Sequence, residues 1–304
     1  MEAKDIPEIK GTNVRILAGS PQCKLGEGPI WHPKFNAFYW IDISDEKLLR
    51  WDPSTDKTDI FVTDRKYTSL AATSEGLIAS CHNFLWRLSL PDLAATKLFE
   101  TSPLDEEKVR FNDGKVTPEG KYFVGSIHLK IREKIGSLYS YGYSGENIQD
   151  LNEPVVCFNG PNWSMDGKQV RWADSAIKAL YAGDWDSKTG QISNKKVFAE
   201  IPEELAVYPD GATVDSEGNI YWALFSGSGI MRLNPQGEIT GKISLPAQWI
   251  TSVAFGGEDM RTLLVTSCNS LTAEKNPEPE GMTFVVTFDD ENIKGQELAI
   301  CNLQ

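Results

Sequence analysis

Short runs of β-branched and aromatic residues recur along the whole chain, separated by Gly, Pro, Asn and Asp. Residues 38–41 (Phe-Tyr-Trp-Ile), 122–124 (Tyr-Phe-Val) and 220–224 (Ile-Tyr-Trp-Ala-Leu) are clear examples. Runs of this length and composition, bounded by turn residues, are typical of β-strands. Amphipathic helical patterns are scarce. The pattern therefore predicts an all-β protein.

A longer unit repeats on top of this pattern. Each copy begins with a polar residue and a small residue, which are followed by an apolar stretch, a turn with Gly or Pro, an aromatic strand and a further strand. In the two clearest copies, 27–53 and 210–235, the last of these strands ends at Asp-Pro or Asn-Pro. The copies are spaced by roughly 40 to 50 residues, the length of one four-stranded propeller blade. The six polar starts are Glu27, Thr68, Asp113, Asn159, Asp210 and Thr251.

Six such units predict a six-bladed β-propeller, with four-stranded antiparallel blades around a central channel. Closed all-β architectures reach this size as one unit, so we expect residues 1–304 to form a single domain. Residues 13–17 precede the first unit and are expected to supply a closing strand to the last blade. The alternative is one β-sandwich, or a pair of them, whose turns imitate a period.

The repeat also predicts a polar centre. The first strand of each blade lines the channel of a propeller, so the six starts should converge around one axis. They comprise three carboxylates, one amide and two hydroxyls. Carboxylates gathered in this way raise one another's pKa unless a cation neutralises them, and oxygen donors favour Ca²⁺, Mg²⁺ or Mn²⁺. The competing interpretation places these acids in the turns of the blades.

Composition excludes several other classes of function. A formal net charge of -13 argues against nucleic acid as a partner. No apolar run has the length of a signal peptide or membrane span, so the expected protein is soluble, cytoplasmic and without a membrane partner. Five scattered cysteines without a C-x-x-C pair indicate buried free thiols. Three dispersed histidines, and the lack of a G-x-S-x-G or dinucleotide motif, argue against zinc protease, serine hydrolase and organic-cofactor chemistry.

Five stretches of the chain, in order, resemble the senescence-marker-protein/gluconolactonase family, which includes regucalcin, luciferin-regenerating enzyme and sugar lactonases. These stretches are 25–31, 110–115, 158–164, 208–211 and 251–257, and the match extends from about Leu25 to about Ser267. The resemblance implies a six-bladed propeller, one divalent metal and hydrolysis of aldonolactones in carbohydrate metabolism.

The resemblance also implies roles for individual residues. Glu27, Asn159 and Asp210 match the family's metal ligands, and Asp210 also matches the residue thought to activate water. Arg110 and Asn112 match its substrate-binding pair.

One segment departs from the pattern of many relatives. Where they have acids after a Gly-Thr-Met-like turn, this chain has Gly125-Ser126-Ile127 followed by His128, Leu129 and Lys130. The change puts the substrate preference in doubt. His128 is interpreted either as a ligand for sugar hydroxyls, as in bacterial pentonolactone hydrolases, or as a solvated loop histidine.

The predicted reaction is the metal-dependent hydrolysis of a sugar lactone to its aldonic acid. In this scheme the metal polarises the carbonyl, Asp210 activates water, and Asp113 orients the neighbouring groups from behind the ligands. Asp113 is alternatively the salt-bridge partner of Arg110. Ca²⁺ is the preferred ion, with Zn²⁺, Mn²⁺, Mg²⁺ and Fe²⁺ as alternatives.

Three other functions compete with this prediction. They are a non-catalytic calcium-binding regulatory protein of regucalcin type, a hydrolase of another ester or lactone, and a WD-type interaction scaffold. The sequence names neither the sugar nor an oligomeric state.

Overall fold

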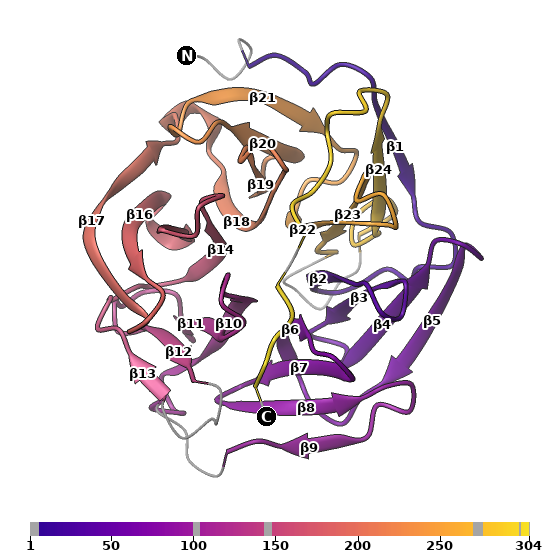
Figure 1. Cartoon of the computed structure of the whole chain (residues 1–304). Coiled ribbons are helices and arrows are strands. Elements are labelled where there is room, and N and C mark those ends of the chain that lie inside the picture. The colour runs from indigo at the N-terminus through magenta and orange to yellow at the C-terminus, as the bar shows by residue number, and fades with distance from the viewer. Residues whose placement is uncertain (1–5, 100–103, 143–147, 270–275, 298, 304) are drawn as a thin grey trace.

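The chain folds into six four-stranded antiparallel sheets arranged in a ring (Figure 1). The structure is a computed structural model that describes residues 6–99, 104–142, 148–269, 276–297 and 299–303. Each sheet is one blade, and the chain runs outward through it from an inner to an outer strand. The prediction of an all-β, six-bladed propeller is confirmed.

Blades 1 to 3 follow one another along the first half of the chain. Blade 1 contains β2 (Gly26–His32), β3 (Ala37–Asp42), β4 (Lys47–Asp52) and β5 (Lys57–Val62). Blade 2 contains β6 (Tyr67–Ala72), β7 (Gly76–Cys81), β8 (Phe84–Ser89) and β9 (Ala95–Lys97). Blade 3 contains β10 (Val109–Val116), β11 (Tyr122–His128), β12 (Leu138–Tyr141) and β13 (Ile148–Asp150).

Blades 4 to 6 complete the ring. Blade 4 contains β14 (Phe158–Trp163), β15 (Gln169–Asp174), β16 (Ala179–Asp186) and β17 (Gln191–Glu200). Blade 5 contains β18 (Tyr208–Val214), β19 (Ile220–Phe225), β20 (Gly229–Leu233) and β21 (Ile239–Ser244). Blade 6 contains β22 (Ile250–Gly256), β23 (Thr262–Ser267), β24 (Phe284–Phe288) and β1 (Thr12–Ile16).

The position of a strand in its blade explains its sequence pattern. Second strands are buried along almost their whole length, and β3 at every residue, because the neighbouring blades cover both of their faces. Their sequences are therefore continuous apolar and aromatic runs rather than alternating ones. Outer strands such as β5 and β17 are largely half-exposed or exposed, and they carry many polar residues.

The hydrophobic core is divided into six clusters, each lying between two adjacent blades. Between blades 3 and 4, Phe123 packs edge-on against Trp163 and Trp185, with ring centroids 5.4 and 5.6 Å away. Each such aromatic contact stabilises the fold by about 1 kcal/mol beyond the burial of its surface. Side-chain packing of this kind joins every pair of adjacent blades.

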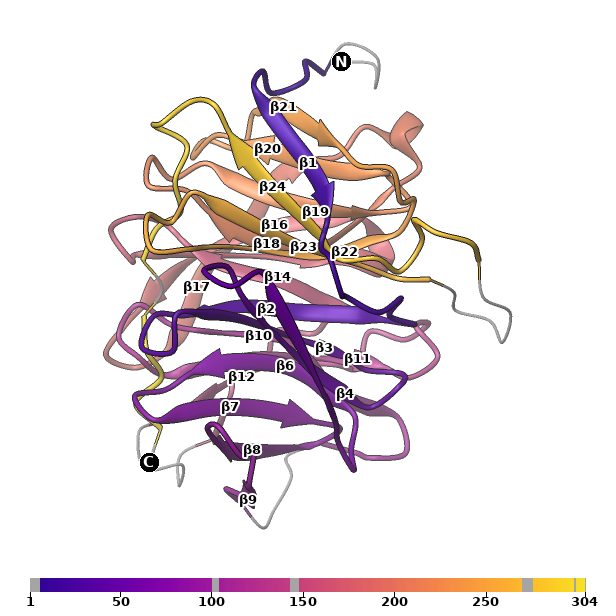
Figure 2. The same cartoon turned by 90° about the vertical axis from the view of Figure 1, so that its right-hand side faces the viewer.

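The ring is closed by the first strand of the chain. β1 lies antiparallel to β24 along all five of its residues, from Thr12 opposite Phe288 to Ile16 opposite Phe284. Figure 2 shows the two strands side by side. The sequence-based prediction that residues 13–17 supply this strand is therefore confirmed, since the last blade takes one strand from the opposite end of the chain.

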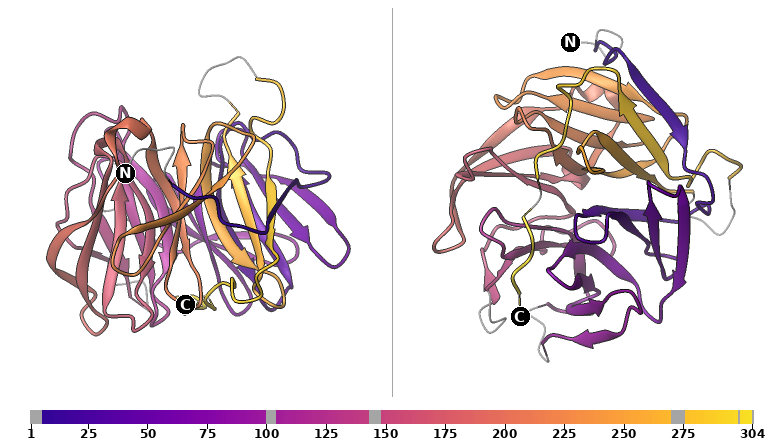
Figure 3. Two further views of the ribbon diagram at one scale, coloured as in Figure 1. Left: turned by 90° about the horizontal axis from the view of Figure 1, so that it is seen from above. Right: turned by 45° about the vertical axis from the view of Figure 1, so that its right-hand side comes forward.

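Beyond β24, the chain returns across one end of the channel. We call residues 289–297 and 299–303 the C-terminal crossing segment; it passes over the middle of the ring in Figure 1, and the right-hand view of Figure 3 shows the same path. Backbone N–H groups donate from Gln296 to Val214 O, from Cys301 to Ala72 O and from Asn302 to Gly120 O. The segment therefore connects blade 6 to blades 5, 2 and 3 at the end of the ring where the inner strands terminate.

Helical structure is minimal in the described part of the chain. It consists of two single 3₁₀ turns, η2 (Ser175–Ile177) and η3 (Glu203–Leu205). No helix among the described residues is long and apolar enough to cross a membrane. All five cysteines are free thiols; four are buried and Cys81 is half-buried, close to the expectation from their spacing.

Candidate active site in the central channel

An irregularity in each inner strand determines where the polar side chains of the channel lie. Every one of the six inner strands has a register shift against its neighbour, with one extra residue on the inner strand. Such a bulge redirects a side chain and is often found beside functional sites. The six predicted starts all lie at or within these bulges. The alternative that placed the acids in blade turns is wrong.

The small residue that follows each start has a steric explanation. Gly160 has a φ of +60°, and a Cβ added to it would lie 2.7 Å from the Asp210 carbonyl oxygen and 2.6 Å from Trp222 Nε1. Gly28 likewise has a φ of +54°. Glycine is the residue that adopts such a backbone without strain. The repeat therefore combines a channel-facing polar side chain with a close approach of adjacent inner strands.

Glu27 and Asp210 both have a raised pKa. Burial, followed by the charge of Asp113, raises the pKa of Glu27 to about 8. Burial, followed by the charges of Glu27 and Asp113, raises the pKa of Asp210 well above its usual range. Ionisation of both carboxyls would therefore gather unfavourable negative charge in this part of the channel. A cation placed between them would remove that conflict.

Asn159 is fixed beside this pair. Its Nδ2 donates to Ser175 Oγ at 2.9 Å, and the Ser175 hydroxyl donates to Pro209 O at 2.5 Å. Its Oδ1 accepts a hydrogen bond from Asn112 Nδ2 at 2.8 Å. An amide oxygen has two lone pairs, so Oδ1 retains one for a further partner.

Arg110 and Asn112 form a second polar group on β10. Arg110 Nη1 donates to Asn112 Oδ1 at 2.9 Å and to Phe111 O at 2.8 Å. Asn112 Nδ2 donates to Phe158 O as well as to Asn159 Oδ1, so both of its hydrogens are used. No ion pair joins Arg110 to Asp113 within the described residues, and the salt bridge considered from the sequence is not found. Arg110 Nε and Nη2 make no hydrogen bond with the described residues.

Asp113 differs from the other two acids of the ring. Its Oδ1 accepts from Gly114 N at 2.7 Å and its Oδ2 accepts from Gly160 N at 2.8 Å. It is the fifth residue of β10, whereas Glu27 and Asn159 are second in their strands. The expectation of three equivalent carboxylates is therefore corrected: both oxygens of Asp113 accept from backbone amides, whereas Glu27 accepts one such bond, from Gly28 N at 3.1 Å. Through Gly160, Asp113 fixes the strand that carries Asn159.

The two threonines of the ring form structural hydrogen bonds. Thr68 Oγ1 lies 2.7 Å from Ser80 Oγ, within blade 2. Thr251 Oγ1 donates to Gly26 O at 2.5 Å and thereby joins blade 6 to blade 1 next to Glu27. The position of a residue in the repeat therefore predicted correctly that it lies at a bulge of an inner strand. It did not distinguish candidate metal ligands from side chains that hydrogen-bond to neighbouring strands.

His128 is the last residue of β11 and is buried, with 5 % of its surface exposed. Its Nδ1 accepts hydrogen bonds from the backbone N–H groups of Arg132 and Glu133 at 3.1 and 2.8 Å. The alternative of a solvated loop histidine is wrong. With Nδ1 used in this way, Nε2 is the nitrogen that can donate to a ligand. Lys130 is exposed in the turn that follows.

Sequence reasoning missed two residues of this region. Ser175 connects Asn159 to the backbone before Asp210, and Cys157 has its Sγ 3.6 Å from Asn159 Nδ2. Neither belongs to the repeated starts. Cys157 comes just before β14 and Ser175 just after β15. Their proximity to Asn159 follows from the pairing of those strands, which no short motif records.

The donor set of the channel fits a hard cation better than a soft one. Glu27, Asp210 and Asn159 offer oxygen atoms, which suit Ca²⁺, Mg²⁺ or Mn²⁺. Within the described ranges, no three His, Cys, Asp or Glu side chains are grouped closely enough to hold a metal ion by themselves. An ion at this position would therefore need the amide oxygen of Asn159 in addition to the two carboxylates.

Comparison with known proteins agrees with this architecture. Residues 25–269 match the model of the SMP-30/Gluconolactonase/LRE-like region. Regucalcin of Xenopus laevis is 33 % identical over 271 residues, covering 84 % of this chain and 88 % of its own.

Two solved structures are similar to the whole ring. A luciferin-regenerating enzyme has a TM-score of 0.88 at 25 % identity, covering 96 % of this chain and 100 % of its own. A calcium-binding protein, regucalcin, from Agrobacterium tumefaciens has a TM-score of 0.85 at 23 % identity, covering 95 % and 97 %. The matching family and relatives support a function of sugar-lactonase or regucalcin type.

Proposed function

Because the chain belongs to the SMP-30/gluconolactonase/LRE-like family, we propose that it hydrolyses a sugar lactone to the aldonic acid in a metal-dependent reaction. The site lies at the end of the channel where the inner strands begin. The observation that carries the proposal is that Glu27 and Asp210 both have a raised pKa, the latter partly through the charge of Glu27, while the amide oxygen of Asn159 keeps a free lone pair.

Glu27, Asp210 and Asn159 are the proposed metal ligands, and Ca²⁺ is the preferred ion. A regucalcin of similar structure is described as a calcium-binding protein, and the donor set consists of oxygen atoms only. When bound, a divalent cation supplies Lewis acidity that polarises the lactone carbonyl and stabilises the developing negative charge.

Asp210 is the proposed general base. A carboxylate that uses one oxygen as a ligand has a second oxygen available to accept a proton from water. Its position is fixed from the backbone, because the Asp210 carbonyl accepts from Trp222 Nε1 at 2.8 Å and Pro209 O accepts from Ser175. A proton acceptor held in this way needs little reorganisation during the reaction.

Arg110 and His128 are the proposed contacts to the sugar. Arg110 Nε and Nη2 remain available to hydrogen-bond substrate oxygens, and His128 Nε2 can donate to a hydroxyl group. Asn112 holds Arg110 on one side and Asn159 on the other, so we assign it to positioning as well as to binding. Asp113 orients the site through Gly160 N.

The decisive experiment replaces the proposed base. Asp210→Asn should lower kcat for hydrolysis of aldonolactones by about 10²- to 10⁴-fold, the usual contribution of a general base. The assay follows acid release with a pH indicator over gluconic, xylonic, arabinonic, galactonic and rhamnonic lactones. Chelator-treated protein is reloaded with each divalent cation in turn. Parental activity in the variant would remove the proposed role.

Asp215→Asn is the matched control. Asp215 directly follows the same strand, and its carboxylate accepts from Glu217 N and Asn219 N in a turn at the other end of the blade. This variant should retain kcat. A regulatory calcium-binding protein is the second candidate, favoured by the regucalcin relatives. It predicts cation binding without acid release above the spontaneous rate in every variant, including the parent.

A further inference from the structure

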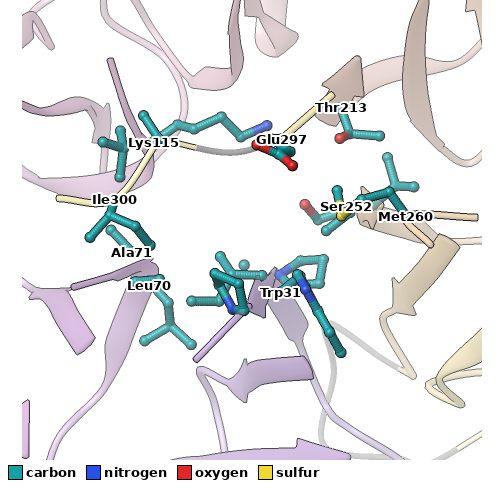
Figure 4. Close-up of a pocket in the computed structure, with 18 of the residues that line it drawn as sticks. Trp31, Leu70, Ala71, Lys115, Thr213, Ser252, Met260, Glu297 and Ile300 are labelled. Carbon is teal, nitrogen blue, oxygen red and sulfur yellow. The ribbon is translucent and has the colours of Figure 1, made fainter. Parts of the chain in front are cut away.

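A separate cavity of about 700 Å³ lies at the end of the channel opposite Glu27 and Asp210. Inner strands of five blades contribute to it, and so does the C-terminal crossing segment, through Glu297, Ala299 and Ile300 (Figure 4). Its volume is within the range of small-molecule sites in proteins. The reaction proposed above uses none of these three residues.

The walls of this cavity are mainly apolar. Trp31, Leu70, Ala71, Met260 and Ile300 face it from blades 1, 2 and 6 and from the crossing segment (Figure 4). Contact between such a surface and the apolar body of a ligand removes both from water and is therefore favourable. A polyhydroxylated sugar acid would lose hydration there without finding enough partners, so the expected ligand differs in kind from the lactone and its product.

One cationic side chain reaches into this apolar space. Among the described residues that line the cavity, Lys115 is the only Lys or Arg. Its Nζ donates to Ala212 O at 2.6 Å, so the side chain extends from blade 3 past blade 4 to blade 5. An ammonium group has three N–H donors, which leaves two after this bond.

The charge of Lys115 is not neutralised by an ion pair. No carboxylate of the described residues lies within salt-bridge distance of its Nζ. Asp113, two residues earlier, directs both carboxylate oxygens to the amides of Gly114 and Gly160. Burial lowers the pKa of Lys115 to about 8 and the charge of Asp113 offsets this only in part, so a bound anion would stabilise the ammonium form.

The mouth of the cavity limits the charge of that anion. Glu258 and Glu297 are exposed there, and Figure 4 shows Glu297 on the same side of the cavity as Lys115. These carboxylates repel a polyanion, such as a phosphorylated compound, more strongly than a single carboxylate. Thr213 and Ser252 add hydroxyl groups to the lining.

We propose that this cavity binds a small monocarboxylic acid with an apolar, ring-sized body. Its carboxylate accepts hydrogen bonds from Lys115 Nζ, and its body packs against Trp31, Leu70 and Met260. The site is distinct from the lactone site, although Asp113 and Gly28 contribute to the wall between the two.

Two probes that differ only in charge test the proposal. Naphthalene-2-carboxylate should bind to the full-length protein in isothermal titration calorimetry, and the neutral naphthalene-2-carboxamide should bind at least about tenfold more weakly, as expected for the loss of one charged contact. Lys115→Met should reduce carboxylate affinity by a similar factor and leave carboxamide affinity unchanged. Equal affinities of the parent protein for the two probes would overturn the role of Lys115.

A second pair of variants locates the binding. Ile300 is half-buried on the crossing segment and packs at the edge of the core between blades 1 and 2, so Ile300→Trp should fill the cavity and abolish binding of both probes. Ile177→Trp, at an exposed position in η2, is the matched control and should bind like the parent. Undiminished binding in Ile300→Trp, or absence of binding to the parent at millimolar probe, would show that the cavity is not the site.

Discussion

At the residue level, Glu27 and Asp210 occupy an environment that is unfavourable for folding. Asp210 is buried and Glu27 is half-buried, and loss of hydration raises the pKa of both; the charge of Asp113 adds to the shift of Glu27, and the charges of Glu27 and Asp113 add to that of Asp210. No described Lys or Arg forms a salt bridge with either one. Buried acids without a counter-ion destabilise a folded protein, so their presence together indicates a site shaped for a ligand rather than for stability.

The stability of the metal-free protein should therefore depend on pH. The pKa of Glu27 rises from 4.5 to about 8 on folding, so the folded state holds this proton more tightly than the unfolded state. That stabilisation is fully present below the unfolded pKa and is lost as pH rises through the folded pKa. We expect Tm of chelator-treated protein to fall from about pH 5 to about pH 8 in a thermal-unfolding series.

Two comparisons test whether Glu27 causes this dependence of Tm on pH and whether a bound cation removes it. Glu27→Gln cannot lose this proton, so its Tm should fall less steeply over the same interval, with the remaining slope due partly to Asp210. A saturating divalent cation should flatten the slope of the parent, because the cation binds the ionised carboxylates. A variant with the full parental slope would refute the assignment to Glu27.

At the level of the elements, the bulged inner strand is the unit that builds the site. Each bulge places a polar side chain toward the channel and is followed by a small residue that lets the next blade approach. Gly160 illustrates both requirements, since its N–H binds Asp113 and its missing side chain makes room for Trp222 and the Asp210 carbonyl. Folding and site geometry therefore depend on the same residue.

Gly160→Ala should destabilise the protein more than a comparable change elsewhere. Gly167 has a similar φ of +68°, but the nearest atom to an added Cβ would be 3.4 Å away, so Gly167→Ala should cost only the backbone strain of about 1 kcal/mol. Gly160→Ala adds a clash and should cost about 3 kcal/mol or more. Urea unfolding measures both variants, and equal losses would show that the close packing is unimportant.

The sequence predicted these elements unevenly, for physical reasons. The second strands, such as β3, were recognised because burial on both faces requires continuous apolar runs. Short polar outer strands such as β9 carry no such signal. The starts Glu27, Asn159 and Asp210 followed from the repeat, whereas the contact between Asn112 and Asn159 joins side chains 47 positions apart and depends on blade packing.

At the level of the whole molecule, the two ends of the chain have different tasks. The N-terminal part joins blades 5 and 6, because Glu8 bridges Lys242 of β21 and β1 then pairs with β24. The C-terminal crossing segment covers the far end of the channel and provides part of the second cavity. The left-hand view of Figure 3 shows this yellow segment along one face of the ring. One end of the chain therefore closes the ring, and the other covers the end of the channel opposite Glu27 and Asp210.

Closure of the ring can be tested by two nested deletions. Removal of residues 1–10 eliminates the bridge to β21 but leaves β1, so Tm should fall by only a few degrees. Removal of residues 1–16 also eliminates β1 and leaves the edge of β24 unpaired. At about 1 kcal/mol for each lost backbone hydrogen bond, the larger deletion should lower Tm by roughly 10 °C.

An unpaired edge strand also promotes association between molecules, so light scattering should detect aggregation of the longer deletion alone. If the two deletions unfold at the same temperature, β1 does not stabilise the closed ring, and the packing between inner strands of blades 6 and 1, including the bond from Thr251 to Gly26 O, must be sufficient by itself.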